Sequence, residues 1–310
     1  MGDEDAAFAV ENVDRFTEMV HQVGGHATTK TSLKSFGGKI LKPFQSKQRG
    51  EREHAFYERV FHTQSEDPVY KQLQPLLPGY HGMVVVNPTT QEAHIGDAAA
   101  VSSDNLDAKH LVMEDLTFDR TWPCIMDVKV GTRSYEHDAS PEKIAYEKQK
   151  FPLQETVGFR IQGIKAFDPK HRAYVQFDKH FGRNVGSKDD LVAAFGNYFA
   201  TFGSAKVNTL LLQAFIRRLE EFKAWFGTQQ ELEFIASSLL FLYNGEILAD
   251  ADDDEEDAIA IALAADIRLI DFAHVTQRPL DAPQLDEGVC TGITTLIQCF
   301  QALLTQLQQQ

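Results

Sequence analysis

The segment WPCIMDVKVG, residues 122–131, constrains the fold most, because it places two opposite charges inside an otherwise apolar run. Its composition predicts a β-strand over residues 124–130, in which successive side chains point to opposite faces. One face would then be wholly apolar, formed by Cys124, Met126, Val128 and Val130. The other face would carry Asp127 and Lys129, with roughly 7 Å between their Cα atoms. The pattern therefore predicts a strand with one face in a core and a carboxylate beside an ammonium group on the other.

Two explanations of this charged pair stay open from the residues alone. Opposite charges inside an apolar strand cost free energy unless something uses them, which favours a functional site that contains Asp127 and Lys129. An exposed ion pair on an edge strand gives the same sequence pattern and would contribute little to stability. The segment by itself does not decide between the two.

A second candidate is LIDFAH, residues 269–274, in which an apolar run ends at Asp271. A carboxylate at the end of a buried strand is a common Mg²⁺ ligand, since Mg²⁺ binds one or two carboxylates together with phosphate oxygens. Taken alone, however, the segment is better explained by an aspartate that caps a helix or forms a turn.

Residues 140–151 are predicted to form a helix with a cationic and aromatic face. The Ser-Pro pair at its start suits the N-cap and the first helical position. A spacing of i, i+3 and i+7 places Lys143, Tyr146 and Lys150 on one face of this helix. Two lysines on one face can bind phosphates, whereas a solvated surface helix is the commoner setting for lysine.

The charge distribution bounds the kind of ligand. The chain has 310 residues and a net charge of -15, which argues against a protein that coats nucleic acid. Seven acidic groups lie in the run DADDDEED, residues 250–257, which we expect to be a mobile solvated loop. Residues 133–183, in contrast, hold ten of the 30 Lys and Arg residues against seven acidic ones. A locally basic segment in an acidic protein is typical of a site for a compact anion.

The remaining bulk features predict a globular protein of a reducing compartment. Hydrophobic residues make up 43% of the chain, so a sizeable core can form, and no apolar run is long enough to predict a membrane span. The first residues are acidic and lack the apolar stretch of a secretory signal. Three scattered cysteines fit neither a disulfide framework nor a zinc site. We expect a monomer in the cytoplasm or nucleus that binds a small molecule and no nucleic acid.

Periodicity and turn signals predict an α+β protein of two lobes. We expect an N-terminal helical or flexible segment over residues 1–30, an N-lobe over 31–116 and a C-lobe over 117–310. Strands are predicted at 36–44, 82–86, 110–116, 124–130, 158–167, 233–243 and 267–272. Helices are predicted at 51–61, 140–151, 189–202 and 209–226, and over roughly the last 20 residues from near Gly292.

Three segments, in this order along the chain, resemble signatures of the inositol polyphosphate kinase family. PCIMDVKVG matches the pattern PxxxDxKxG of that family through Pro123, Asp127, Lys129 and Gly131. ASSLLFLYNG, residues 236–245, resembles its SSLL segment. IDFAH, residues 270–274, resembles its metal-binding segment. The resemblance covers nearly the whole chain.

This resemblance implies the two-lobed fold of a protein kinase, with an antiparallel N-lobe sheet, a larger mixed C-lobe, and ATP between them. The chain nevertheless contains neither a P-loop nor the HRD loop of a protein kinase. The resemblance further implies that Lys42, or less favourably Lys39, contacts the ATP phosphates and is oriented by Glu53. Backbone groups of Glu114 and Leu116 would hold the adenine.

The resemblance also implies roles for the charged residues that follow. Asp127 would contact the ribose, Lys129 would lie between the γ-phosphate and the acceptor hydroxyl, and Asp271 would bind Mg²⁺. Asp127 and Lys129 are thus the expected catalytic residues. The inositol phosphate would be bound within residues 133–183 and beyond, by Lys129, Lys143, Tyr146, Lys150, Lys179 and His274. Because Lys143 and Lys150 lie roughly 10.5 Å apart along the helix axis, they are expected to span two phosphates on opposite sides of the ring.

The choice of inositol phosphate leaves alternatives. The short segment after the signature, including FPL at residues 151–153, resembles the multikinase subfamily, which phosphorylates inositol trisphosphate and tetrakisphosphate. GTR at residues 131–133 and the lysine at 179 are also similar to the inositol hexakisphosphate kinases, which make pyrophosphates. The third alternative is a non-catalytic inositol phosphate-binding scaffold with the same fold, which the intact signature charges disfavour.

Overall fold

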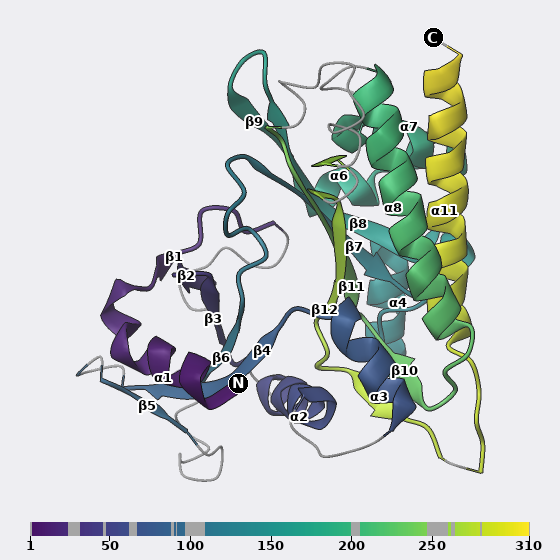
Figure 1. The fold of residues 1–310 in the computed structure, drawn as a ribbon. Coiled ribbons are helices and arrows are strands. Elements are labelled where there is room, and N and C mark those ends of the chain that lie inside the picture. The colour runs from purple at the N-terminus through teal and green to yellow at the C-terminus, as the bar shows by residue number, and fades with distance from the viewer. Residues whose placement is uncertain are drawn as a thin grey trace. The chain divides into compact units, whose positions relative to one another are not determined.

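A computed structural model of the chain describes residues 2–23, 32–45, 48–61, 67–87, 90, 92–96, 109–199, 205–246, 260–261, 264–279 and 281–309. The chain divides into two compact units, whose elements are labelled in Figure 1. The first unit comprises Met1–Asp119 with Asp271–Val275, and the second Arg120–Ile270 with Thr276–Gln310. Where they are described, the N-terminal residues therefore belong to the first unit. The acidic run 250–257 lies outside the described residues.

A six-stranded antiparallel sheet organises the first unit, in the order β1-β2-β3-β6-β4-β5. Its strands are β1 (Thr17–Glu18), β2 (Lys34–Phe36), β3 (Lys39–Pro43), β4 (Tyr80–Val86), β5 (Ala93–Ile95) and β6 (Lys109–Glu114). Gly37 and Gly38 make the turn from β2 to β3 with positive φ, a conformation that glycine adopts without strain. The helical elements are α1 (Gly2–Glu11), η1 (Val13–Arg15), α2 (Arg49–Phe61), α3 (Pro68–Leu73) and η2 (Gln74–Leu76).

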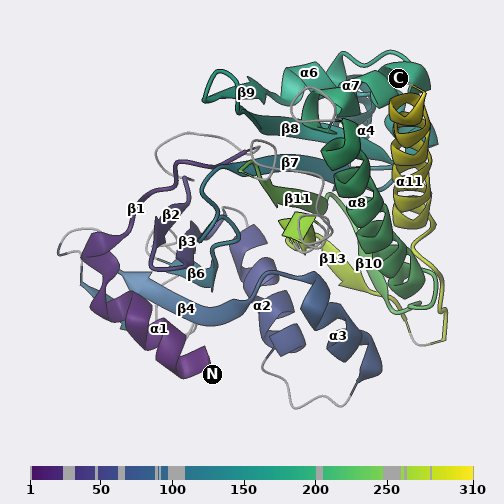
Figure 2. The ribbon, with the colours of Figure 1, turned by 45° about the horizontal axis from the view of Figure 1, so that its top comes forward.

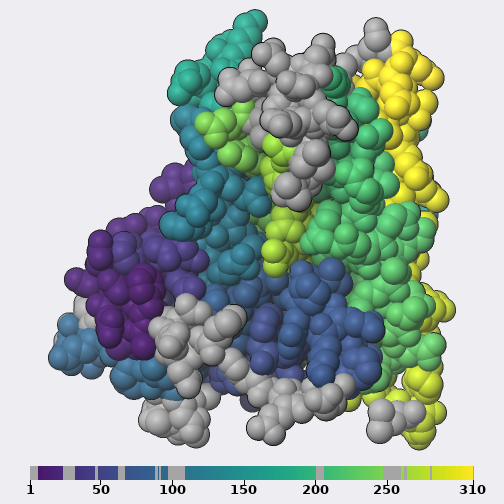
Figure 3. All heavy atoms as spheres, viewed as in Figure 1, coloured from purple at the N-terminus to yellow at the C-terminus, as the bar shows by residue number. Residues whose placement is uncertain are grey.

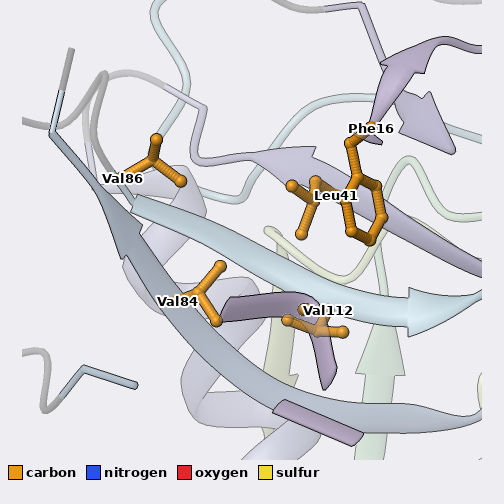
Figure 4. Packing of buried hydrophobic residues seen from close by; sticks show 6 residues of the cluster. Phe16, Leu41, Val84, Val86 and Val112 are labelled. Atoms are coloured by element: carbon orange, nitrogen blue, oxygen red, sulfur yellow. The ribbon is translucent and has the colours of Figure 1, made fainter. Parts of the chain in front are cut away.

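Apolar side chains from the N-terminal segment and the sheet form a shared core. Figure 4 shows Phe16 near Leu41 of β3, with the valines of β4 and β6 on the same side of the sheet. Ala9 of α1 is buried in this cluster as well. Because these residues leave water together, α1 and the segment after it are an integral part of the first unit.

A five-stranded antiparallel sheet organises the second unit, in the order β12-β11-β7-β8-β9. Its strands are β7 (Pro123–Val130), β8 (Phe159–Asp168), β9 (Ala173–Phe177), β11 (Ser238–Asn244) and β12 (Asp266–Ile270). A separate pair joins β10 (Leu232–Phe234) to β13 (Val275–Gln277). The strand that carries Asp127 and Lys129 is thus the central strand, which rules out the edge-strand explanation of the two charges.

Helices α7 (Lys188–Phe199), α8 (Ala205–Phe226) and α11 (Glu287–Gln308) cover one face of this sheet, as Figures 1 and 2 both show. The helices of the unit are α4 (Pro141–Lys150), α5 (Gln154–Val157), α6 (Lys179–Arg183), α7 (Lys188–Phe199), α8 (Ala205–Phe226) and α11 (Glu287–Gln308). Phe215 of α8 and Phe300 of α11 pack on Phe241 of β11, with ring centroids 5.6 and 5.7 Å away. Phe241 pairs with Met126 of β7, so the predicted apolar face of that strand is the face under the helices.

The C-terminal helix α11 runs beside α8, and the two form a continuous surface in Figure 3, in green and yellow. By length and composition α11 is the one described helix that could cross a membrane. Half of that apolar stretch is buried inside the protein. Packing on α7 and α8 therefore accounts for its apolar character, as in the core helix of a globular protein.

Most predicted elements are present, but several differ from the sequence-based expectation. The strand predicted at 233–243 is two strands, because Ala236 between them adopts a left-handed conformation with φ 60°. Helix α11 begins at Glu287, where Asp286 accepts the N-cap hydrogen bond from the Val289 amide, and not near Gly292. Strand β9 and helix α3 were not predicted, since their segments are short and show little periodicity.

Gly292 yields a stability prediction, because α11 packs directly against the backbone of Gly158 at this residue. A Cβ on Gly292 would lie 2.1 Å from the carbonyl oxygen of Gly158, which itself accepts a 2.7 Å hydrogen bond from the Gly131 amide. Gly292→Ala should therefore destabilise the protein by about 2 kcal/mol or more. Gly196→Ala in α7 is the matched control, since its Cβ would meet nothing within 4 Å, and it should stabilise by about 0.5–1 kcal/mol. Denaturant unfolding measures both, and equal effects of the two changes would contradict the prediction.

Candidate active site

Lys42, Glu53 and Asp271 meet in the first unit although they are far apart in the sequence. Lys42 lies on β3, Glu53 on α2, and Asp271 directly after β12. The Lys42 Nζ donates to Glu53 Oε1 and to Asp271 Oδ1, both at 2.8 Å. The Glu53 side chain is 2% exposed, that of Lys42 16% and that of Asp271 38%. A buried glutamate thus holds a lysine whose other carboxylate partner reaches solvent.

The two carboxylates control the charge of Lys42. Burial alone would lower the pKa of its ammonium group, but Asp271 and Glu53 outweigh burial and raise that pKa above the ordinary value of 10.5. Lys42 is therefore a permanent cation at neutral pH. Lys39, the other lysine considered from the sequence, lies near His81 instead, with 3.5 Å between Nζ and Nε2.

The backbone around Asp271 fixes where its carboxylate lies. Asp271 has φ 67°, a left-handed conformation that is uncommon for a residue other than glycine. The next residue, Phe272, donates its amide to Glu53 Oε1 and packs its buried ring against Phe56, with centroids 4.5 Å apart. A partly exposed carboxylate held in this way suits a Mg²⁺ ion that is also bound by phosphate oxygens. His274 follows in the turn and is partly exposed.

The predicted adenine-binding residues lie at the end of β6. The Glu114 amide donates to Gly79 O at 2.8 Å, and its carboxylate accepts from the Gly79 amide. The Asp115 amide donates to Gly38 O, so this segment is tied to the glycine turn before Lys39. The Glu114 amide therefore already has an acceptor within the first unit.

The second unit places the charges of the signature on β7 between two neighbouring strands. The Lys129 Nζ donates to the carbonyl of Ala236 at 2.9 Å. In the sheet register, Ser238 lies opposite Lys129, and Asp127, which is buried, lies opposite Leu240. The second signature segment, through the left-handed Ala236 and the small buried Ser238, therefore packs directly against the lysine of the first. The carbonyl of Ala236 positions Lys129 on the central strand.

Helix α4 carries the predicted cationic face, but its two lysines converge. Ser140 caps the helix as predicted, accepting from the Lys143 amide. The Nζ atoms of Lys143 and Lys150 both lie 2.7 Å from the same Oε1 atom of Glu147. The expected span of two separate phosphates is therefore wrong for this arrangement, because the ammonium groups meet at one point. Tyr146 lies against both, with its ring centroid 4.2 Å from Lys150 Nζ and 5.8 Å from Lys143 Nζ.

Arg160 on β8 is a candidate that the sequence reasoning missed. It lies opposite Lys129 in the sheet, is 3% exposed, and has no hydrogen-bond partner at Nε or Nη1 among the residues that the structure describes. Burial lowers the pKa of its guanidinium, the charge of Glu147 opposes that shift, and Arg183 of α6 adds to it. Buried donors without partners are costly, at about 1–3 kcal/mol each, unless a ligand accepts from them. The signal was available in FRIQGIKAF, where one arginine interrupts an apolar strand.

Lys179 and Arg183 lie at opposite ends of the short helix α6, which Asp178 caps. Gly182 allows α6 to approach β8 closely, since a Cβ there would be 2.1 Å from Ile161 O. The structure therefore brings Arg183 close enough to affect Arg160 electrostatically.

A further cluster of charged side chains in the second unit is centred on Glu233. Glu233 of β10, which is buried, accepts from Arg133 at 2.7 Å, His137 at 2.9 Å and Arg278 at 3.3 Å. Arg133 lies just before α4, whereas Arg278 follows β13. Burial opposes the ionisation of Glu233, but these cations lower its pKa below the ordinary value of 4.5.

The model of the family described as inositol polyphosphate kinase matches residues 110–301, which include β7, α4, α6 and Asp271. The chain belongs to the inositol polyphosphate kinase family.

Individual relatives in the inositol polyphosphate kinase family carry the multikinase name. The inositol polyphosphate multikinase of Mus musculus is 34% identical over 228 residues, which are 73% of this chain and 53% of that protein. Inositol polyphosphate multikinase beta of Arabidopsis thaliana is 29% identical over 307 residues, 93% of this chain and 94% of that protein. The chain thus spans about half the length of the mammalian relative and nearly all of the plant one.

A solved structure agrees with the fold. The inositol phosphate multikinase of S. cerevisiae, in complex with ADP and Mn²⁺, superposes with a TM-score of 0.62 at 27% identity. The match covers 86% of this chain and all of the yeast chain. The α+β fold of two units predicted from the sequence is therefore that of an inositol polyphosphate kinase.

The Glu233 cluster predicts a pH-dependent stability. Because its folded pKa is depressed, Glu233 stabilises the protein above pH 4.5, and this contribution is lost as pH falls through its folded pKa. Glu233→Gln should lower the free energy of unfolding by on the order of 2 kcal/mol at pH 7, and by less as the pH falls below 4.5. Denaturant unfolding at several pH values measures the difference. Glu155→Gln is the control, because Glu155 forms an exposed pair with Lys148, and a similar loss there would contradict the prediction.

Proposed function

We propose that this protein is an ATP-dependent kinase that phosphorylates soluble inositol polyphosphates, as an inositol polyphosphate multikinase does. The observation that carries the proposal is the Lys42 ammonium held between Glu53 and Asp271. A lysine oriented by a buried glutamate, next to a carboxylate that reaches solvent, is the arrangement that kinases use for nucleotide phosphates and their metal. The multikinase names of the relatives and the ADP and Mn²⁺ bound to the yeast neighbour support the same chemistry.

The proposed roles follow from charge and from family membership. Phosphoryl transfer requires mainly alignment and neutralisation of the charge on the transferred group. Lys42 would bind ATP phosphates and Asp271 would bind Mg²⁺, which supplies charge neutralisation when bound. The backbone at Glu114 and Leu116 would hold adenine, and Asp127 the ribose. Lys129 would stabilise the γ-phosphate and the acceptor oxygen, with its ammonium placed by Ala236 O.

The inositol phosphate would bind to the cations of α4 and β8. Lys143 and Lys150 converge at Glu147, and Arg160 has buried N–H groups that find no partner in the described part of the chain. Two ammonium groups that meet near one point suit a single phosphate group better than two distant ones. Tyr146, Lys179 and His274 would complete recognition, and Arg183 adds charge beside Arg160.

The multikinase activity is preferred over the two alternatives. The names of the relatives favour it over an inositol hexakisphosphate kinase, and the ordered triad of Lys42, Glu53 and Asp271 disfavours a non-catalytic scaffold. Incubation with ATP, Mg²⁺ and a panel of inositol phosphates tests all three. Products that carry one more phosphate from the trisphosphate and tetrakisphosphate support the proposal. Pyrophosphate products from the hexakisphosphate alone, or no ATP consumption with any inositol phosphate, would refute it.

Asp271→Asn tests the nucleotide side of the site. The change removes the proposed charged Mg²⁺ ligand with little change of shape, so turnover should fall by on the order of 100-fold or more. Steady-state kinetics at ordinary Mg²⁺, with circular dichroism to check the fold, measures the effect. Turnover near that of the wild type would remove Asp271 from the site.

Charge removal on α4 tests the substrate side. Lys143→Ala and Lys150→Ala should each raise KM for the inositol phosphate, while KM for ATP stays unchanged. The expected loss of binding free energy is about 1.5–3 kcal/mol for each variant, because each removes a charge-assisted hydrogen bond. The effect should shrink at high salt, because partly exposed charges are screened. Lys148→Ala is the control on the same helix, since Lys148 pairs with Glu155. An unchanged KM in both variants, or the same change in the control, would mean that Lys143 and Lys150 are surface residues that do not bind the substrate.

A further inference from the structure

Glu147 is an acidic side chain that lies against both lysines of the cationic face of α4. Its carboxylate is 7% exposed, and a single oxygen accepts from both Lys143 and Lys150 at 2.7 Å. Burial opposes its ionisation, yet the two lysines lower its pKa below the ordinary value of 4.5, so it is a carboxylate at neutral pH. Glu147 is also the strongest favourable charge acting on Arg160. A permanent anion therefore occupies the centre of the cations proposed to bind substrate.

The hydrogen bonds show what this anion does to the cluster. Because both ammonium groups lie on one oxygen, they are no farther apart than twice 2.7 Å. Ammonium groups that close would repel each other without the carboxylate between them. The same carboxylate uses donors that a phosphate oxygen would otherwise use, and its charge repels any phosphate that approaches. Glu147 thus organises the cations and competes with an anionic ligand.

The charge balance decides which of these two effects dominates. Asparagine and glutamine side chains keep an acceptor oxygen without a net charge. A glutamine at 147 could still accept from one lysine, so part of the organisation would remain while the repulsion would be removed. For a ligand with several doubly charged phosphates, removing a like charge at hydrogen-bonding range is the larger effect.

We propose that Glu147 determines the affinity and selectivity of the inositol phosphate site by acting as an internal anion that competes with substrate phosphate for Lys143 and Lys150. The inference rests on the proposed function, because it concerns the same site. It follows that the wild-type site binds less tightly than its cations allow. It also follows that Glu147 penalises ligands more strongly the more phosphates they carry. Glu147 thereby sets selectivity among inositol phosphates of different charge.

The test is direct binding without ATP, by titration calorimetry with inositol trisphosphate and inositol hexakisphosphate. Glu147→Gln should lower Kd by about tenfold for the trisphosphate and by more for the hexakisphosphate; tenfold corresponds to about 1.4 kcal/mol. The dependence of Kd on salt should also become steeper, because the site gains one net positive charge. Glu155→Gln makes the same change of net charge at the exposed pair with Lys148, on the neighbouring helix α5. It should change neither Kd by more than about twofold.

The outcomes separate this inference from the proposed function. Tighter binding by Glu147→Gln together with an unchanged Glu155→Gln supports the inference. If the wild type binds and Glu147→Gln binds equally well or more weakly, the inference is overturned, because the carboxylate would then only position the lysines. The proposed function would remain intact. Equal tightening in both variants also overturns it, because net charge alone would then explain the effect. A wild-type protein that binds neither ligand overturns both.

Discussion

The central position of β7 determines how the charged residues of the second unit must be arranged. Side chains of a strand that is paired on both sides project from the faces of the sheet and lie beside residues of two neighbouring strands, so the lysine and aspartate of β7 depend on those neighbours. The carbonyl of Ala236, just before β11, accepts a hydrogen bond from Lys129, and the small side chain of Ser238 on β11 lies opposite that lysine. β8 places Arg160 on the other side of Lys129. Two signature segments that are more than a hundred residues apart in the sequence are thereby parts of one structural element.

Buried glutamates are the second recurring device. Glu53 holds Lys42, Glu147 holds Lys143 and Lys150, and Glu233 holds Arg133 and Arg278. Removing one partner from a buried ion pair leaves an uncompensated charge, so each cluster is fixed strongly as long as it is complete. An enzyme that binds highly charged phosphates needs many cations near one another. Carboxylates placed among them keep those cations ordered before a ligand arrives, at the cost of competing with it.

The sequence predicted the local pieces of the site well where a pattern has a short range. The alternation in residues 124–130 predicted which face of β7 enters the core, and the Ser-Pro start predicted the beginning of α4. The motif resemblance brought Lys42, Glu53 and Asp271 into one functional group, and their side chains do meet. Sequence reasoning missed Arg160, because a single arginine in a strand carries no periodic signal, and it misjudged the lysines of α4. Axial spacing along a helix measures the distance between Cα atoms, whereas long side chains can converge on a common partner.

The sequence by itself determined most of the longer elements, the family and the identity of most of the charged site residues, since these depend on periodicity, capping and local motifs. Only the tertiary structure decided that β7 is a central strand, that Arg160 lies beside Lys129, and that one carboxylate holds both lysines of α4. The physical reason is that hydrogen bonding between strands and ion pairing between side chains depend on distances through space. Residues that are far apart in the chain set those distances, and no local pattern records them.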